Sequence, residues 1–277
     1  MKKYFFLFAL ILIVSCSTPS DKTEAPHPRI VVLSPELAEI ICSLRAEDHI
    51  IGITQECDYP KTLTQKESVG SFSAPNLEKI ISLEPDAVLL TGMEQEIFKH
   101  KLQDLKITVY QFYPTSINGL YETISEIGTY LKKEDNADSL IHEMQNSIEK
   151  IQKPEESPTI YIEIYNKPLM TASSDSFVGD VINAAGLKNI FPELPREYCS
   201  VSAEKVVELN PDIILITYPG VNSEDIKDRL GWDTISAVKN NMIYTTEDID
   251  PDIILRAGPR IVQGIQALSQ LGNQHNE

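Results

Sequence analysis

The chain has 277 residues and carries 24 Lys and Arg against 41 Asp and Glu, which gives a formal net charge of −17. This acidic balance argues against a nucleic-acid partner, because binding to phosphates requires a basic face. About 250 residues follow the N-terminal segment, enough for one large or two modest α/β domains.

The N-terminal segment is typical of a secreted protein. Lys2 and Lys3 precede an apolar run of about a dozen residues, shorter than the roughly 20 that a membrane-spanning helix needs. Residues 1–15 are therefore predicted to form a signal peptide. The run ends in IVSC, which resembles the lipobox of bacterial lipoproteins and implies lipidation of Cys16; an ordinary secretory signal with a chance cysteine is the alternative. Residues 16–28 are predicted to be a flexible tether.

The next part of the chain alternates short apolar runs with an amphipathic segment. Its predicted strands and helix, in chain order, span residues 30–33, 35–44, 50–54 and 107–112. Ser34 is the expected N-cap of the helix. Alternation of strands and helices predicts a parallel sheet covered by helices, and residues 29–135 are therefore expected to form an N-terminal lobe.

The chain contains an internal repeat. Residues 76–91, NLEKIISLEPDAVLLT, align without a gap on residues 202–217, SAEKVVELNPDIILIT. Each copy is predicted to be a short helix that stops at a proline, followed by an apolar run typical of a buried parallel strand. Two copies of one αβ unit predict two similar lobes. The identities pair Glu78, Lys79, Leu83, Pro85, Asp86, Leu89 and Thr91 with Glu204, Lys205, Leu209, Pro211, Asp212, Leu215 and Thr217.

A single helix is predicted between the two copies. Residues 136–153 place their apolar side chains on one stripe, and a helix of that length spans about 27 Å. Residues 154–277 are expected to form a C-terminal lobe. The fold predicted is α/β, with two doubly wound lobes joined by one long helix and a ligand cleft between them. The predicted elements of the second lobe span residues 159–164, 176–185, 213–218 and 242–245.

The order of several motifs resembles a cluster of bacterial periplasmic binding proteins. Its members have two lobes joined by one long helix and serve ABC importers of cobalamin, ferric siderophores and haem. The CDYP loop, the VGSF segment and the PNLE segment are most similar to the cobalamin-type members. The motifs that carry the resemblance are RIVVLSP at 29–35, CDYP at 57–60, VGSF at 69–72, NLEKI at 76–80, LEPD at 83–86 and RAGPRI at 256–261.

Candidate ligand-binding residues follow the predicted strands. Ligands of doubly wound sheets bind outside the carboxyl ends of the strands, so the loops at those ends are the expected cleft walls. Several of these side chains are aromatic and suit a broad, flat, partly apolar ring system. The candidates are Ser34, Pro35, Glu56, Tyr59, Phe72, Met93, Tyr165, Lys167, Tyr198, Tyr218 and Arg256.

The expected ligand is a corrinoid, such as cobalamin, with a ferric siderophore or haem as the alternative. The resemblance to the cobalamin-type members implies that Phe72 packs on the corrin face and that Arg256 lies near the cleft. At the position of Glu56, the cobalamin binder has an aromatic residue instead. An anionic ferric complex would favour a cluster of Arg and Lys, and the predicted loops contain few bases among many acids. Haem would need an axial Tyr or His. Tyr candidates exist in the predicted cleft loops, but none of the five histidines lies there.

The repeated carboxylates Glu78 and Glu204 suggest a second site. Each opens a predicted helix in the matching place of its lobe. The resemblance implies that they dock onto arginines of the two membrane subunits of the importer, a contact that sets orientation more than affinity. The alternative is that both acids stabilise the helix dipole. The protein is expected to act as a monomer, anchored by its lipid on the extracytoplasmic side.

No catalytic motif is present in the sequence. No GxGxxG follows the first predicted strand, and neither a Walker loop nor a GxSxG elbow occurs, so the sequence predicts a binding protein rather than an enzyme. The five histidines lack ligand spacing, and no metal or cofactor is expected. Besides Cys16, the sequence has Cys42, Cys57 and Cys199, among which at most one disulfide could form.

Overall fold

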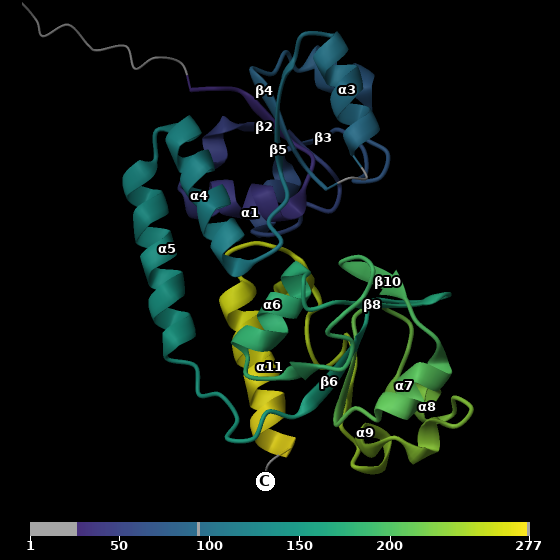
Figure 1. The fold of residues 1–277 in the computed structure, drawn as a ribbon. Helices are drawn as coiled ribbons and strands as arrows, with labels where there is room; N and C mark the ends of the chain where they lie inside the picture. Colours follow the sequence, from purple (N-terminus) through teal and green to yellow (C-terminus); the bar gives the residue numbers. More distant parts are fainter. Residues whose placement is uncertain (1–26, 93–94, 276–277) are drawn as a thin grey trace, which may run out of the picture.

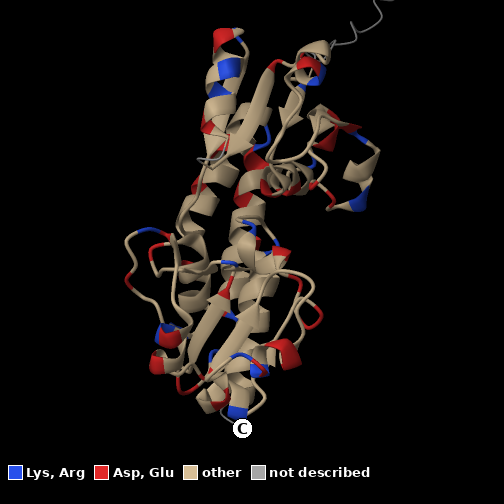
Figure 2. Cartoon of the chain, turned by 90° about the vertical axis from the view of Figure 1, so that its right-hand side faces the viewer, with Lys and Arg blue, Asp and Glu red and all other residues tan. Residues whose placement is uncertain are grey.

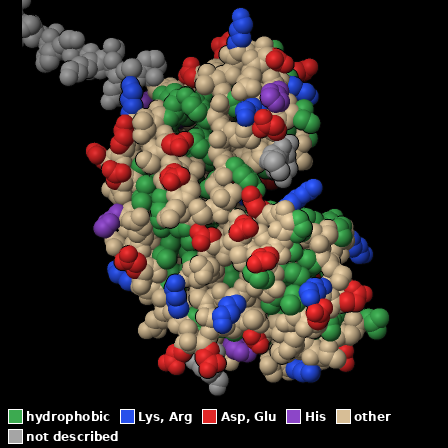
Figure 3. Space-filling model, viewed as in Figure 1, with side chains coloured by type: hydrophobic (Ala, Val, Ile, Leu, Met, Phe, Trp, Pro, Cys, Tyr) green, Lys and Arg blue, Asp and Glu red, His purple; other side chains and the backbone are tan. Residues whose placement is uncertain are grey.

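The computed structural model describes residues 27–92 and 95–275, and it folds them into two lobes (Figure 1). Turned by 90°, the molecule shows one lobe above the other, with acidic positions spread over both (Figure 2). The surface is hollowed between the lobes on the side opposite helix α5 (Figure 3). The signal peptide, most of the tether, Cys16 and Met93 lie outside the described residues.

The N-terminal lobe contains a parallel five-stranded sheet of order β3-β2-β1-β4-β5. The apolar strands β1 and β4 are buried along their whole length, as expected for central strands of a covered parallel sheet. The strands are β1 (Ile30–Val32), β2 (Ile50–Ile53), β3 (Glu67–Ser68), β4 (Ala87–Thr91) and β5 (Thr108–Phe112). The helices are α1 (Pro35–Ser43), α2 (Leu77–Ser82), α3 (Glu96–Asp104) and α4 (Ile117–Leu131), with single 3₁₀ turns at Glu47–His49 and Lys61–Gln65.

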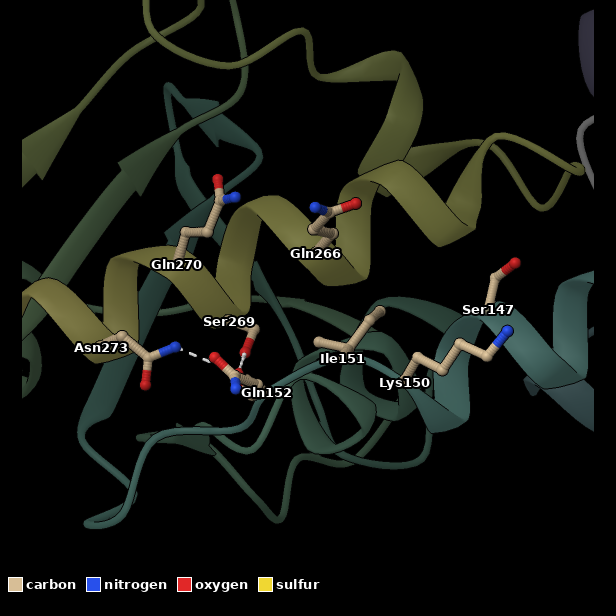
Figure 4. A pocket seen from close by; sticks show the side chains of 8 residues that line it. All are labelled: Ser147, Lys150, Ile151, Gln152, Gln266, Ser269, Gln270 and Asn273. Carbon is tan, nitrogen blue, oxygen red and sulfur yellow. Dashed lines mark hydrogen bonds between the residues drawn. The ribbon is translucent and has the colours of Figure 1, made fainter.

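Helix α5 (Glu134–Glu149) leads from the first lobe to the second and packs against α4. It begins two residues before the predicted start and ends four residues before the predicted end. The carbonyl of Gln152 explains the early end, because it accepts hydrogen bonds from Ser269 Oγ and, at 3.0 Å, from Asn273 Nδ2 (Figure 4). The chain after α5 therefore leaves the helical path to pack on α11 (Ile261–His275).

The C-terminal lobe combines two sheets. A parallel sheet has the order β12-β11-β6-β9, and a three-stranded antiparallel sheet has the order β10-β8-β7. The antiparallel sheet was not predicted from the sequence. The strands are β6 (Thr159–Glu163), β7 (Tyr165–Asn166), β8 (Leu169–Ala172), β9 (Lys188–Asn189), β10 (Tyr198–Ser200), β11 (Ile213–Ile216) and β12 (Ile243–Tyr244). The remaining helices are α6 (Phe177–Ala184), α7 (Ala203–Leu209), α8 (Ser223–Lys227), α9 (Ser236–Lys239) and α10 (Asp252–Leu255), with a 3₁₀ turn at Trp232–Thr234.

The internal repeat has the same conformation in both lobes, as α2 followed by β4 and α7 followed by β11. The repeated aspartates have the same role. Asp86 accepts a hydrogen bond from the backbone nitrogen of Arg29 at 2.7 Å, and Asp212 accepts one from that of Thr159 at 2.9 Å. Each aspartate thus joins its turn to the start of the neighbouring strand. The prediction of two α/β lobes joined by a helix is confirmed.

None of the helices within residues 27–92 and 95–275 is both long enough and apolar enough to cross a bilayer.

Candidate functional site

The carboxyl ends of the two parallel sheets meet at the cleft. Tyr113 directly follows β5, and its hydroxyl hydrogen bonds to the Glu197 carboxylate of the other lobe at 2.8 Å. The backbone nitrogen of Ile117 donates to Asp180 on α6 at 2.8 Å, so the start of α4 also contacts the second lobe. The loops after the strands therefore face the gap, which is where ligands of doubly wound sheets bind.

On the N-terminal wall, two polar side chains hold the loop that carries Phe72. The backbone nitrogen of Phe72 donates to Glu56 Oε2 at 2.8 Å, and its carbonyl accepts from Gln95 Nε2 at 3.1 Å. Gln95 also donates to the carbonyl of Leu33 at 2.9 Å. Glu56, predicted to bind ligand, thus positions Phe72. Gln95 was missed by the sequence analysis, because nothing near it in sequence marks its partners.

Ser34 and Pro35 lie at the carboxyl end of β1, where α1 begins, and both are buried. Glu36 follows them and is half-buried. Burial raises the pKa of the Glu36 carboxyl, against the opposing effects of the Ser34 and Thr91 hydroxyls and the Arg256 charge. The sequence analysis placed Ser34 and Pro35 here but did not select Glu36, a titratable group at this edge of the sheet.

The C-terminal wall includes the antiparallel sheet. Tyr165 lies opposite Met170, and Tyr198 lies opposite Ala172. Residues opposite each other share a face, as do residues two apart on one strand, so Tyr165 and Tyr198 project from the same face of this sheet. Tyr165 is 52% exposed, while Tyr198 packs partly against the core. Lys167 is exposed in the turn between β7 and β8. Two predicted aromatics are thus brought together.

Tyr218, a predicted ligand-binding residue, is bound through its hydroxyl to other side chains of the second lobe. Its hydroxyl hydrogen bonds to Glu163 Oε1 and accepts from Arg229 at 3.2 Å, and its ring packs in a core cluster of the second lobe. Burial and the Glu163 carboxylate raise the pKa of Tyr218. Its phenol is therefore fixed to the lobe beneath the cleft, although the residue follows β11 as expected.

A buried ion pair holds Tyr218 in place. Glu163, at the end of β6, is fully buried and accepts from both terminal nitrogens of Arg229, at 2.6 and 2.8 Å. The guanidinium also lies 4.5 Å from the ring centre of Trp232, a cation–π distance. The sequence analysis missed this pair. The acid at the end of the apolar run TIYIE could have indicated it, because a carboxylate on a buried strand needs a partner of opposite charge.

Arg256 and Arg260 join the lobes through carboxylates. Arg256 contacts Asp58, Asp252 and Glu39 at 3.0, 2.8 and 3.3 Å. Arg260 binds Glu39 with two nitrogens, at 2.7 and 2.8 Å. The Glu39 hydrogen bonds raise the pKa of Arg260 despite its burial. With Asp250, also paired to Arg260, four carboxylates share two guanidinium groups, and we call these six residues the interlobe network.

Tyr59 is covered by this network. The guanidinium of Arg260 lies 4.2 Å from the centre of its ring. One face of this predicted cleft aromatic is therefore occupied by the protein itself, although the side chain is 46% exposed. Arg260 was not predicted to have a role, since its partner Glu39 lies 221 residues away in the sequence.

Glu39 is expected to stabilise the contact between the lobes. It is 3% exposed, and the substitution Glu39→Gln removes the charge that both arginines share. Breaking a buried pair from one side costs about 3 kcal/mol or more, so the free energy of unfolding should fall by about that amount. Chemical denaturation measures it. Glu143→Gln, on the exposed side of α5, is the control; an equal change in both variants would contradict the role given to Glu39.

Glu78 and Glu204 are exposed in the first turns of α2 and α7. The helices have side-chain caps at the same position. Asn76 Oδ1 accepts from the nitrogen of Lys79 at 3.0 Å, and Ser202 Oγ accepts from the nitrogen of Lys205 at 3.2 Å. The two carboxylates are thus presented by equivalent turns, one on each lobe.

The described cysteines Cys42, Cys57 and Cys199 are free thiols. Burial raises the pKa of Cys42 to about 12 and that of Cys57 to about 11. Within residues 27–92 and 95–275, no group of three or more His, Cys, Asp and Glu is arranged to hold a metal ion.

The fold and the cleft define a class, the two-lobe solute-binding proteins, in which two sheets face one another across a gap and a long helix joins the lobes. The family model described as periplasmic binding protein matches residues 30–249, and this chain belongs to that family. The family binds solutes and does not consist of enzymes, so the prediction of a binding protein is confirmed.

Known relatives span nearly the whole chain. It is 30% identical to an uncharacterised ABC transporter substrate-binding lipoprotein of Bacillus subtilis, YvrC, over 95% of this chain and 94% of that one. It is 24% identical to a vitamin B12-binding protein of Vibrio campbellii, over 93% of each. A possible iron-binding, periplasmic solute-binding protein of Staphylococcus epidermidis has a known crystal structure and is 30% identical in sequence to this chain. The two structures match with a TM-score of 0.77, over 88% of this chain and 98% of that one. The chain is an ABC transporter substrate-binding protein.

Proposed function

We propose that this protein captures a corrinoid, cobalamin or a related compound, and delivers it to the membrane permease of an ABC importer. The observation that carries the choice of ligand is the state of Arg256. Its guanidinium is already bound by Asp58, Asp252 and Glu39. An anionic ligand needs a guanidinium with free donors, and this one is already paired with carboxylates.

The aromatic side chains support a flat ring system as the ligand. Phe72 is half-buried on a loop whose backbone is held by Glu56 and Gln95, so this part of the chain is already ordered before a ligand binds. Tyr165 and Tyr198 share one face of the antiparallel sheet in the other lobe. Rigid aromatic surfaces bind a broad apolar ring at low cost in conformational entropy. The vitamin B12-binding relatives agree with this choice.

A ferric siderophore or haem is the alternative ligand. The exposed phenol of Tyr165 favours it, because a tyrosine can serve as an axial ligand of haem iron. The Staphylococcus epidermidis relative, described as a possible iron binder, points the same way. Against it, both arginines of the interlobe network are engaged by carboxylates and are not available to the propionates of haem.

A panel of coloured ligands tests the choice. The purified protein without residues 1–28 is mixed with hydroxocobalamin, cobinamide, haemin and a ferric catecholate complex, and then separated from free ligand by gel filtration. We expect a corrinoid to co-elute with the protein and to release heat in a titration calorimeter. Retention of haemin or the ferric complex alone would establish the alternative, and retention of none would refute both.

The anchor and the docking contacts complete the proposal. Cys16 carries the lipid that holds the monomeric protein on the extracytoplasmic side of the membrane, with residues 16–28 as tether. Glu78 and Glu204 dock onto basic side chains of the two permease subunits. Their equivalent, exposed positions on the two lobes support this pairing, since a permease dimer offers two equivalent contact points.

A further inference from the structure

Glu36 lies at a close contact between the two lobes. It is the second residue of α1, immediately beyond the carboxyl end of β1. The segment after α10 passes beside it: a side-chain carbon at Gly258 would lie 3.7 Å from Glu36 Cβ. Arg256, two residues before Gly258, is near enough for its charge to affect Glu36. Glu36 is therefore beside the contact between the lobes, at the carboxyl end of the first sheet, and we call this place the floor of the gap.

The Glu36 carboxyl has no ion-pair partner among the described residues, in contrast to Glu39 one turn later, which binds two guanidinium groups. The single hydroxyl proton of Thr91 goes to the carbonyl of Phe112 at 2.8 Å, so Thr91 has none to give to Glu36. Ser34 Oγ, in a fully buried side chain beside it, has no described hydrogen-bond partner of ordinary geometry. The Ser34 hydroxyl and the backbone of Glu36 are then the neutral donors that act on this carboxyl, and neither carries a charge.

The surroundings of Glu36 have too few positive charges to supply a partner. The interlobe network beside it already has four carboxylates for two guanidinium groups. Burial raises the pKa of Asp252 in that network as well as the pKa of Glu36, as expected where acids outnumber bases in a partly dry site. The described residues give Glu36 hydroxyl and backbone donors and the more distant charge of Arg256, but no ion pair, so a further hydrogen-bond donor or a cation from a ligand would complement it.

We propose that Glu36 is a specificity-determining residue that accepts hydrogen bonds from carboxamide N–H groups on the rim of a corrinoid, and that it excludes corrinoids whose rim bears carboxylates. The inference rests on the proposed function and adds a chemical criterion to it. A carboxamide that donates to Glu36 favours its ionised form and so opposes the effect of burial on its pKa, whereas a carboxylate in the same place is repelled and leaves Glu36 without that donor.

Two matched probes test the inference. Cobinamide has carboxamides around the corrin ring, and cobyrinic acid has carboxylic acids in the same places. Titration calorimetry at neutral pH should show that the wild-type protein binds cobinamide at least about 10-fold more tightly, the value of one charge-assisted hydrogen bond. Glu36→Gln keeps the size of the side chain and should reduce the preference to less than about threefold. Glu149→Gln, at an exposed position on α5, should retain it in full.

Each result separates the inference from the proposed function. Equal binding of both probes by the wild-type protein, or an unchanged preference in Glu36→Gln, overturns the role of Glu36 and leaves the corrinoid function standing. Binding of neither probe overturns both. Thermal unfolding checks that the variant is folded. If Glu36→Gln does not fold, Glu36→Asp replaces it in the test, because aspartate is shorter by one methylene and withdraws the carboxylate. This variant should show a reduced preference for cobinamide. Full retention of the preference in Glu36→Asp contradicts the inference.

Discussion

Replacement of Glu163 by leucine is expected to lower the free energy of unfolding by about 3 kcal/mol, or roughly 6–12 °C in melting temperature for a chain of this size. Glu163 is fully buried and binds both terminal nitrogens of Arg229. Leucine has a similar volume but cannot accept a hydrogen bond, so the arginine and the Tyr218 hydroxyl lose their shared partner. We expect the lower end of the range for a broken buried pair, because 22% of the Arg229 side chain is exposed.

The matched control replaces both partners of the ion pair by apolar side chains, whereas Glu163→Leu removes only one of them. A triple variant, Glu163→Leu with Arg229→Met and Tyr218→Phe, leaves no buried charge without a partner and also removes the hydroxyl that Glu163 binds. Because replacement of a complete buried pair by apolar groups is often neutral, it should regain most of the lost stability. Denaturation in urea, with the slope compared among variants, measures all of these values. A triple variant less stable than Glu163→Leu alone would contradict this account.

The same experiment reports on the cleft. Tyr218 directly follows β11, and its hydroxyl is bound by the pair beneath it. If Tyr218 lines the ligand site, Glu163→Leu should also weaken corrinoid binding, since the ring loses the contacts that fix it. Tyr218→Phe alone keeps both the aromatic ring and the ion pair, and it therefore separates loss of the hydroxyl from loss of the ring's support.

The two-lobe fold could be predicted because its signals are local. In the repeat, an N-cap, a helix of about two turns, a proline and a short apolar run stand next to one another in sequence, and both copies fold as predicted. The antiparallel sheet could not be predicted in this way. Strand β7 has two residues and β10 has three, which is too short for a period of two to be recognised.

The loops around the cleft could be predicted, but not the contacts of their side chains. The rule that ligands bind beyond the carboxyl ends of parallel strands selected the loops that carry Phe72, Tyr165 and Arg256. It could not show that Arg256 is surrounded by carboxylates, because Glu39 lies 217 residues away in the sequence. It also could not show that Tyr218 is bound to Glu163. Long-range pairs of this kind depend on how the lobes pack, and a single sequence does not encode them in a readable pattern.

Reversal of both docking charges, Glu78→Lys with Glu204→Lys, is expected to reduce uptake of a corrinoid by about 100-fold while leaving its binding in solution unchanged. The carboxylates are exposed on α2 and α7, in turns capped by Asn76 and Ser202, so their replacement should not disturb the lobes. If basic side chains of the permease face them, each reversal places like charges together at a cost of several kcal/mol. Loss of a first-turn acid costs the helix only about 0.3–1 kcal/mol, which is too little to explain such a loss of uptake.

Two measurements separate delivery from binding. Uptake of radiolabelled ligand by cells measures delivery, and calorimetry with the purified variant measures binding in solution. The matched control is Glu126→Lys with Glu149→Lys, which changes the net charge equally at exposed positions on α4 and α5. A single reversal at Glu78 or Glu204 should give an intermediate loss, because one docking contact remains. Equal losses in the docking and control variants would mean that overall charge, rather than paired docking, governs delivery. Loss of binding in solution would instead place these carboxylates in the ligand site.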